Sequence, residues 1–331
     1  MSNRDKIKDK IIEKLVESKG DPVSGESLAN ELSISRSAVW KHIQALKQEG
    51  YMIESSTNRG YSLVRSPDRL EPGEIKAGLK TKLIGKNIQY LKETESTNTI
   101  ARSIAPSVEE GTVVIAESQT GGRGRLGRRW ISPEGGIWLS IIIKPKIQLI
   151  YASRITLLAG VAVAKVIRSY GLAARIKWPN DVLIDGKKVC GILTEMEAEM
   201  DMIEYCVVGI GIDANVDTET FPEDYRESST SLKKELGHEI VRVEFVQKLL
   251  LEFDDLYQKF LEDGFSSILE EWRNMSETIG EWVKITTQSR ILYGEAIGVD
   301  SEGALIIETS DGRLEKIVAG NCEHLRKGYG T

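Results

Sequence analysis

The 331-residue sequence has little cysteine and little histidine, with three residues of each. They are scattered along the chain, at Cys190, Cys206 and Cys322 and at His42, His238 and His324. The cysteines form no Cys-x-x-Cys pair, so the sequence favours neither a disulfide framework nor a zinc site. The wide spacing of the histidines likewise argues against a metal held by His or Cys.

The sequence also lacks the long apolar runs that mark signal peptides and membrane spans. Its first twenty residues are charged throughout, without the apolar core of a signal peptide. The longest apolar stretch, Ile155–Gly171, contains Lys165 and Arg168 and is shorter than the roughly 20 residues that cross a bilayer. We therefore expect a buried helix there, no membrane segment, and a protein of the reducing cytoplasm.

The overall charge points to no particular partner. Hydrophobic residues make up 40% of the chain, charged residues 28%, and the net charge is −6. That balance is ordinary for a soluble protein and says nothing for or against nucleic acid by itself. The length allows two or three compact domains, each with its own core.

Residues 1–65 carry the pattern of three helices followed by a hairpin. Apolar residues recur at helical spacing in each predicted helix, at Ile7, Ile11, Ile12, Leu15 and Val16, at Leu28, Ala29 and Leu32, and at Val39, Ile43 and Leu46. Ser24 and Ser35 are predicted N-caps, and Gly50 ends the third helix. The alternating stretch that follows, turning at Asn58-Arg59-Gly60, predicts a two-stranded wing.

This order resembles a winged helix-turn-helix, whose second helix of the pair enters the DNA major groove. The residues expected to contact DNA lie on the outer face of the third helix and at the wing tip: Arg36, Ser37, Lys41, His42, Gln44 and Arg59. Trp40 is expected in the core. Residues 1–65 hold 11 Lys or Arg against 9 Asp or Glu, the mildly basic end of an acidic protein. The alternative is a small helical bundle that only mediates protein contacts.

A proline- and charge-rich stretch, 66–74, is predicted to be a linker. Residues 75–278 then alternate strand and helix patterns, which predicts an α/β unit with a mixed sheet and its helices on one side, in an α+β arrangement. Residues 279–331 alternate with period two and contain closely spaced glycines, which predicts a small β-barrel. That segment has no aromatic cluster for binding single-stranded nucleic acid, so we expect a packing role.

The stretch TGGRGRLGRRW, residues 120–130, combines four glycines with four arginines. Glycine lets a backbone close around a ligand, and arginine's planar fork suits carboxylate and phosphate oxygens. The stretch is no P-loop, because no Gly-Lys-Ser/Thr follows. Four further pieces share the chain with this one: ESTN (95–98), KWPND (177–181), KKVCGIL (187–193) and GIGIDANV (209–216).

In this order the five pieces resemble the biotin protein ligases. With the helix-turn-helix in front and the barrel behind, the chain is similar to their bifunctional branch, which also represses biotin genes. The resemblance implies a central domain of biotin/lipoate ligase type and an SH3-like C-terminal barrel. It also implies ATP with Mg²⁺, biotinyl-5′-AMP as intermediate and corepressor, transfer to a lysine of a carrier domain such as that of acetyl-CoA carboxylase, operator DNA, and a homodimer.

The resemblance also assigns residues. Biotin would lie along Ser96, Thr97, Asn98, Gln119, Arg123, Gly124, Arg125, Lys188, Gly191 and Gly209. The nucleotide would contact Arg128, Trp130, Asn180, Asp213 and Asn215, with Trp130 stacked on adenine and Asn180 serving the magnesium as well. Catalysis would fall to Lys188, Arg123, Arg125 and Asp181, with Asp181 orienting the incoming lysine. The chemistry agrees, because joining a carboxylate to an α-phosphate needs cations and close backbone N–H groups.

The sequence departs from the family at one position, where Asp213 replaces the usual Asn. An ionised Asp only accepts hydrogen bonds, whereas Asn also donates. We expect Asp213 to accept from the adenine amino group or to hold magnesium through water.

Two functions of other classes stay open at this point. One is a repressor whose ligase-like domain only senses biotin, although sensing would not require phosphate-facing cations. The other is a lipoate-type acyl ligase of similar fold. Among single residues, Lys187 is expected in solvent, Trp138 in the core, and Trp178 and Pro179 could serve packing alone.

Overall fold

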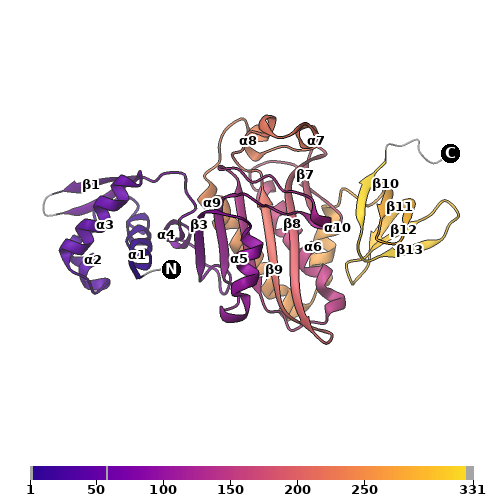
Figure 1. Ribbon diagram of the computed structural model, residues 1–331, viewed down its shortest axis with the longest axis horizontal. Coiled ribbons are helices and arrows are strands. Elements are labelled where there is room, and N and C mark those ends of the chain that lie inside the picture. Colours follow the sequence, from indigo (N-terminus) through magenta and orange to yellow (C-terminus); the bar gives the residue numbers. More distant parts are fainter. Residues whose placement is uncertain (1–2, 57–58, 326–331) are drawn as a thin grey trace.

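The computed structural model describes residues 3–56 and 59–325. Its elements form three units in a row: a helical unit at one end, a central unit built on a seven-stranded sheet, and a five-stranded sheet at the other end (Figure 1). The predicted α+β multidomain architecture is confirmed.

The N-terminal unit has the predicted order of helices and hairpin. It consists of α1 (Asn3–Glu17), α2 (Gly25–Glu31), α3 (Arg36–Gln48), β1 (Met52–Ser56) and β2 (Gly60–Arg65). Both predicted caps form, since Ser24 Oγ accepts from the Glu26 N–H at 3.2 Å and Ser35 Oγ from the Ala38 N–H at 3.1 Å. The strands pair antiparallel as a wing. Asn58, predicted in the turn of the wing, lies outside the described residues.

The sequence predicted four core residues in α3, of which three are buried and one, Trp40, is not. Val39, Ile43 and Leu46 are fully buried, as the helical spacing predicted. Trp40, expected in the core, is 54% exposed instead. Residue 40 is rotated about 100° around the helix from residue 39, so it leaves the buried row and lies between residues 36 and 44 on the neighbouring row.

The predicted linker is not an exposed spacer along its whole length. Residues 70–74 are buried, and α4 (Pro72–Lys76) begins inside the stretch. This helix packs between α1 and a long helix of the central unit, and a Cβ at Gly73 would clash with the Asp9 carbonyl oxygen. The Tyr51 hydroxyl donates to Glu74 Oε1 at 2.8 Å, so the N-terminal and central units are joined by buried contacts.

The central sheet is mixed, as predicted. Its strands are β3 (Ile88–Thr94), β4 (Val113–Gln119), β5 (Ile137–Ile143), β6 (Arg175–Lys177), β7 (Asp181–Ile184), β8 (Lys187–Glu199) and β9 (Met202–Ile212). They lie in the order β3-β4-β5-β9-β8-β7-β6, with β3 and β4 parallel and the other pairs antiparallel. The edge strand β3 was not predicted, because its polar sequence lacks a clear alternating pattern.

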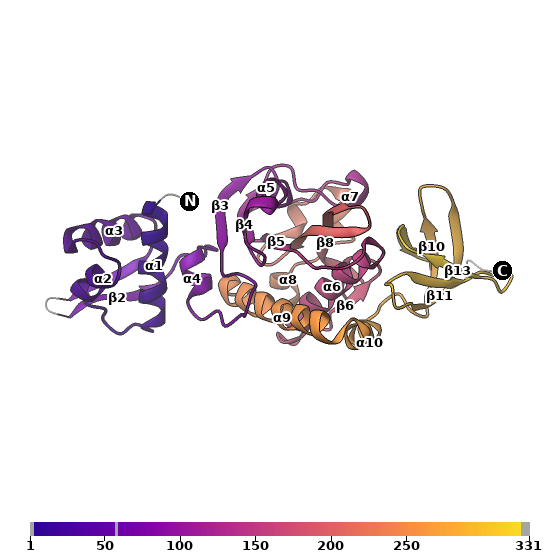
Figure 2. The same ribbon diagram turned by 90° about the horizontal axis from the view of Figure 1, so that it is seen from below.

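Helices cover both faces of this sheet, which corrects the expectation that they lie on one side. α5 (Thr97–Ile104) packs on one face, whereas α6 (Ala152–Arg168) and α9 (Arg242–Asp263) pack on the other (Figure 2). The stretch Leu149–Arg168 is long and apolar enough to cross a membrane, but 61% of its 18-residue apolar window is buried in the structure. It is the core helix that the sequence predicted.

The remaining elements complete the central and C-terminal units. In the central unit, α7 (Glu223–Arg226) and α8 (Leu232–Leu236) follow the last strand, and α10 (Ser266–Asn274) follows α9. The C-terminal unit is an antiparallel sheet of β10 (Trp282–Thr286), β11 (Ile291–Val299), β12 (Leu305–Glu308), β13 (Leu314–Ile317) and β14 (Asn321–His324). Short 3-10 turns occupy Ala105–Ser107, Arg125–Gly127, Leu149–Tyr151 and Thr218–Thr220.

Candidate functional site

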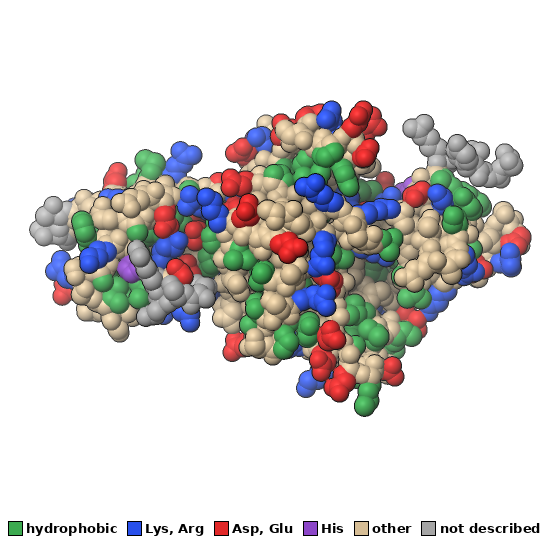
Figure 3. Space-filling model, in the orientation of Figure 1, with side chains coloured by type: hydrophobic (Ala, Val, Ile, Leu, Met, Phe, Trp, Pro, Cys, Tyr) green, Lys and Arg blue, Asp and Glu red, His purple; other side chains and the backbone are tan. Residues whose placement is uncertain are grey.

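The central unit holds a cavity of about 550 Å³, within the size range of small-molecule sites. The glycine and arginine loop, the ends of β7, β8 and β9, the start of α5, the α7 segment and residues of the C-terminal sheet all line it. The cavity therefore joins pieces that lie far apart in the sequence. On the face shown in Figure 3, Lys and Arg side chains gather in the middle of the central unit.

Short backbone contacts fold the glycine and arginine loop back on itself. The Gly124 N–H donates to the Arg128 carbonyl at 2.7 Å, and the Trp130 N–H donates to the Gly122 carbonyl at 2.9 Å. A Cβ at Gly122 would lie 2.5 Å from the Trp130 carbonyl oxygen, so this position needs glycine. The glycines thus serve the close loop geometry that the sequence predicted.

The Trp130 side chain packs against two glycines, Gly191 and Gly211. A Cβ at Gly211 would clash with its indole Nε1, and one at Gly191 would lie 3.0 Å from Cζ3. Its ring meets the buried Trp138 edge-on at 6.5 Å, and the ammonium of Lys188 lies 4.9 Å from the ring centroid. The expected core position of Trp138 is confirmed, whereas Trp130 lines the cavity.

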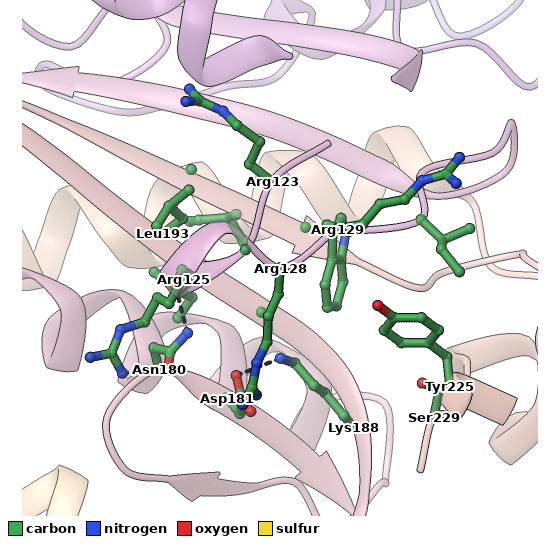
Figure 4. A pocket seen from close by; sticks show the side chains of 18 of the residues that line it. Arg123, Arg125, Arg128, Arg129, Asn180, Asp181, Lys188, Leu193, Tyr225 and Ser229 are labelled. Carbon is green, nitrogen blue, oxygen red and sulfur yellow. Dashed lines mark hydrogen bonds and ion pairs between the residues drawn. The ribbon is translucent and has the colours of Figure 1, made fainter. Parts of the chain in front are cut away.

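The four arginines of the loop do not all point the same way (Figure 4). Arg125 is half-buried and donates to Asn180 Oδ1 at 3.2 Å, and Arg128 points toward Asp181. Burial lowers the pKa of Arg125, and nearby Asp181 opposes that shift, but an arginine remains charged at neutral pH. Arg123, expected at the reacting centre, turns away to Thr99 and Glu195.

Lys188 and Asp181 form an ion pair, with the Lys188 Nζ 2.7 Å from Asp181 Oδ1 (Figure 4). Both side chains are about a quarter exposed and line the cavity. Together with Arg125 and Arg128, Lys188 places three cations and one carboxylate at this end of the cavity. Lys187 beside it is exposed, as expected.

A buried polar network forms the opposite wall. The Thr97 N–H donates to Gln119 Oε1 at 2.8 Å, and the Ser140 hydroxyl donates to Asn98 Oδ1 at 2.7 Å while its oxygen lies 2.8 Å from Thr97 Oγ1. Ser96, Thr97 and Asn98 are each 3–4% exposed. A Cβ at Gly209 would clash with the Asn98 amide, so glycine there makes room for this wall. Ser96 occupies the N-cap position of α5, but its side chain makes no cap hydrogen bond.

Sequence reasoning missed several residues of the site. Ser140 and Ser132 support the polar wall, and Tyr225, Ser229 and Asn321 line the cavity from α7, the loop after it and the C-terminal sheet. No local motif marks these positions. Trp178 is buried and donates its indole N–H to the Gly303 carbonyl at 3.2 Å, so it packs the central unit against the C-terminal one.

The two residues predicted from the last motif have different surroundings. Asp213 lines the cavity at 2% exposure, and its Oδ1 has no hydrogen-bond partner among the described residues. Burial raises the pKa of Asp213 well above its usual range, while Lys188 lowers it less. The expected contact of Asp213 with the adenine amino group or with magnesium stays a prediction.

Asn215 does not reach the cavity. Its amide is occupied by both backbone groups of Ile240, with the Asn215 Nδ2 donating to the carbonyl and the Oδ1 accepting from the N–H, each at 2.9 Å. Asn215 therefore holds the segment before α9 in place, and its contact with the nucleotide stays a prediction.

In residues 3–56 and 59–325, no three His, Cys, Asp or Glu side chains gather to hold a metal ion.

Among the predicted DNA contacts, Arg36, Ser37, Lys41 and Arg59 are exposed, whereas His42 and Gln44 are half-buried. Ser37 lies 2.9 Å from the capping Ser35, hydroxyl to hydroxyl.

Comparison with known families matches each unit of the chain. Residues 90–213 match the biotin/lipoate A/B protein ligase family, residues 8–62 match an HTH domain, and residues 278–325 match the biotin protein ligase C-terminal domain. The three matches follow the order of the three structural units.

Individual relatives extend the likeness over nearly the whole chain. A bifunctional ligase/repressor BirA from Bacillus spizizenii is 40% identical over 97% of this chain and 99% of its own, and that of Escherichia coli is 30% identical over 91% and 92%. A solved biotin protein ligase from Aquifex aeolicus, in complex with biotin and ATP, is 31% identical and superposes with a TM-score of 0.63, covering 73% of this chain and 100% of that one.

Proposed function

Because the chain belongs to the family of bifunctional biotin ligases and repressors, we propose that it joins biotin to a carrier protein and represses biotin genes. The ligase is ATP-dependent and AMP-forming. A carboxylate oxygen of biotin attacks the α-phosphorus and pyrophosphate leaves; a carrier lysine then attacks the acyl carbon and AMP leaves. We assign DNA binding to residues 1–65, catalysis to 75–278 and a C-terminal unit to 279–331, which lines one side of the site through residues such as Asn321.

The proposal rests on the observation that one cavity has a cationic wall at one end and a buried, uncharged polar wall at the other. One end presents Arg125, Arg128 and Lys188. The other presents a buried polar network that includes Thr97 and Asn98. Cations stabilise the charge that builds up when a carboxylate approaches a phosphate, and fixed polar groups orient a neutral ring.

Lys188 is the central cation of the first step. In the unliganded site its charge is balanced by Asp181 at 2.7 Å. A bound biotin carboxylate and α-phosphate would draw the ammonium away from that partner and hold it between them. Asp181 is then free to orient the carrier lysine for the second step.

Magnesium fits the site as a companion of ATP. Mg²⁺ keeps several waters and takes one or two protein oxygens together with substrate phosphates. Asn180 and Asp181 supply oxygens at the cationic end, although each already has a protein partner. Magnesium would help bind and neutralise the triphosphate, while the chain's own arginines hold its oxygens.

Regulation follows from linkage. If biotinyl-5′-AMP binds the homodimer better than the monomer, it must promote dimers, and a dimer binds two half-sites of operator DNA. The partners we propose are a biotin carrier domain, such as that of acetyl-CoA carboxylase, operator DNA and a second copy of the chain. A cytoplasmic location agrees with the free, buried thiols of its cysteines.

The direct test is incubation with biotin, MgATP and a purified carrier domain, followed by intact mass. A single biotin-sized shift is expected on the carrier, strongly slowed by Lys188→Ala. Lys187→Ala is the matched control, because it removes the exposed neighbouring ammonium. No shift with well-folded wild-type protein would leave the sensor-only repressor as the better interpretation.

A further inference from the structure

The outer surface of α3 carries a large apolar side chain where a solvated helix would carry polar ones. Trp40 is 54% exposed, and the rows of helical neighbours place it beside Arg36 and Gln44 at i±4 and Ser37 at i−3. Three of the residues predicted to contact DNA thus surround it. A single exposed apolar side chain is common on protein surfaces, so what distinguishes Trp40 is its place among residues predicted to contact DNA.

Charge selects the kind of partner that this face fits. The sequence of α3, RSAVWKHIQALKQ, contains Arg36, Lys41 and Lys47 and no acidic residue, although the whole chain has a net charge of −6. Arg59 adds an exposed cation at the wing. A basic helix with one exposed aromatic favours a polyanion that offers apolar spots, and DNA offers the thymine methyl group in its major groove.

We propose that Trp40 contacts thymine methyl groups in the major groove of the operator and so contributes to sequence recognition. The inference rests on the proposed repressor function and deepens it. Arg36 and Lys41 beside Trp40 would bind phosphates, which sets position without reading sequence. The indole would supply apolar discrimination between thymine and cytosine at the bases it covers.

The test uses a duplex selected from a random pool by the full-length protein in the presence of biotin and MgATP. The same duplex is then made with deoxyuridine in place of thymidine, which removes only the C5 methyl groups. Affinities are measured for wild type, Trp40→Ala and Leu261→Ala, a control that truncates an exposed leucine on α9. Matching circular dichroism spectra and melting temperatures show that all three proteins are folded, and equal carrier biotinylation shows that the central unit is unaffected.

Wild type is expected to lose about tenfold in affinity on the uracil duplex, of the order of one lost base contact. Trp40→Ala is expected to bind the thymine duplex about tenfold more weakly than wild type and to bind both duplexes alike. Leu261→Ala should behave as wild type. The salt dependence of Trp40→Ala should be unchanged, because no phosphate contact is lost.

Two results overturn the proposal in different ways. Equal affinity of wild type for the thymine and uracil duplexes, or the same uracil loss in Trp40→Ala, would show that Trp40 does not read methyl groups, while DNA recognition itself would stand. Failure of the protein to enrich any duplex would overturn the repressor function and this inference with it.

Discussion

The ammonium of Lys188 lies 2.7 Å from the carboxylate of Asp181, at the end of the cavity where Arg125 and Arg128 also point. The two side chains come from neighbouring antiparallel strands, β8 and β7. In the free protein each charge offsets the other. If Lys188 contacts the substrate as proposed, this ion pair must open when the substrate binds.

Asp181→Asn should slow the transfer step more than adenylation. Adenylation depends on the cations, which this change leaves in place, whereas the carrier lysine loses a carboxylate that orients it. We expect at least a tenfold slower transfer, within the range of a general acid–base contribution. Mixing preformed enzyme-bound biotinyl-5′-AMP with carrier measures that step alone. A larger effect on adenylate formation than on transfer would contradict the assignment.

Gly211→Ala should displace the Trp130 side chain, which packs directly against Gly211. The added Cβ would clash with the indole Nε1, and overpacking of this kind costs about 1–3 kcal/mol. We expect weaker ATP binding by calorimetry, with folding preserved. Gly298→Ala is the matched control, because nothing lies within 4 Å of a Cβ there. Unchanged ATP affinity in Gly211→Ala would remove Trp130 from the nucleotide site.

Asp213 should make stability fall as the pH rises. Burial raises the pKa of its carboxyl, so the folded protein holds a proton that the unfolded chain releases above about pH 4. The folded state therefore binds more protons, and its stability declines with pH. Asp213→Asn removes this term, so the variant should gain stability over wild type between pH 5 and pH 8 in denaturant titrations.

The amide of Asp213→Asn offers the donor and acceptor of a neutral acid, so ATP affinity should be retained. Asp213→Leu removes both and should lose ATP affinity. Equal pH dependence of stability in wild type and Asp213→Asn would show that Asp213 is ionised when folded.

A second pH effect is expected where the N-terminal and central units meet. Burial raises the pKa of Asp9 to about 6 and that of Glu74 to about 7, so these carboxyls hold protons that the unfolded chain loses near pH 4. Stability should therefore fall from pH 5 to pH 8, by on the order of 2 kcal/mol, and Glu74→Gln should reduce the fall. A denaturation midpoint that does not change between these pH values would contradict it.

Local patterns predicted local features well. The caps at Ser24 and Ser35, the buried rows of the first helices and the hairpin of the wing need only neighbours in sequence, and the structure confirms them. The core prediction for Trp40 was wrong because apolar character alone does not say on which row of a helix a residue lies. The prediction of an exposed linker over 66–74 was wrong because the burial of this stretch depends on α1 and α9, which lie far away in the sequence.

The site shows the same limit. The loop, Lys188 and Asp181 could be found because each belongs to a compact motif, yet their ion pair depends on strand register. Asn215 was assigned to the nucleotide by family resemblance, whereas its hydrogen bonds with the Ile240 backbone are tertiary contacts that no motif predicts. Tyr225 and Asn321 reach the cavity only because a loop segment and the C-terminal sheet fold over it.

The most direct test of the central claim is exchange of labelled pyrophosphate into ATP, without any carrier. Formation of a biotinyl adenylate makes that exchange depend on biotin. We expect exchange with biotin and none with lipoate, strongly reduced in Lys188→Ala and unchanged in Lys187→Ala. Exchange that lipoate supports equally well, or no exchange with biotin at all, would contradict the account.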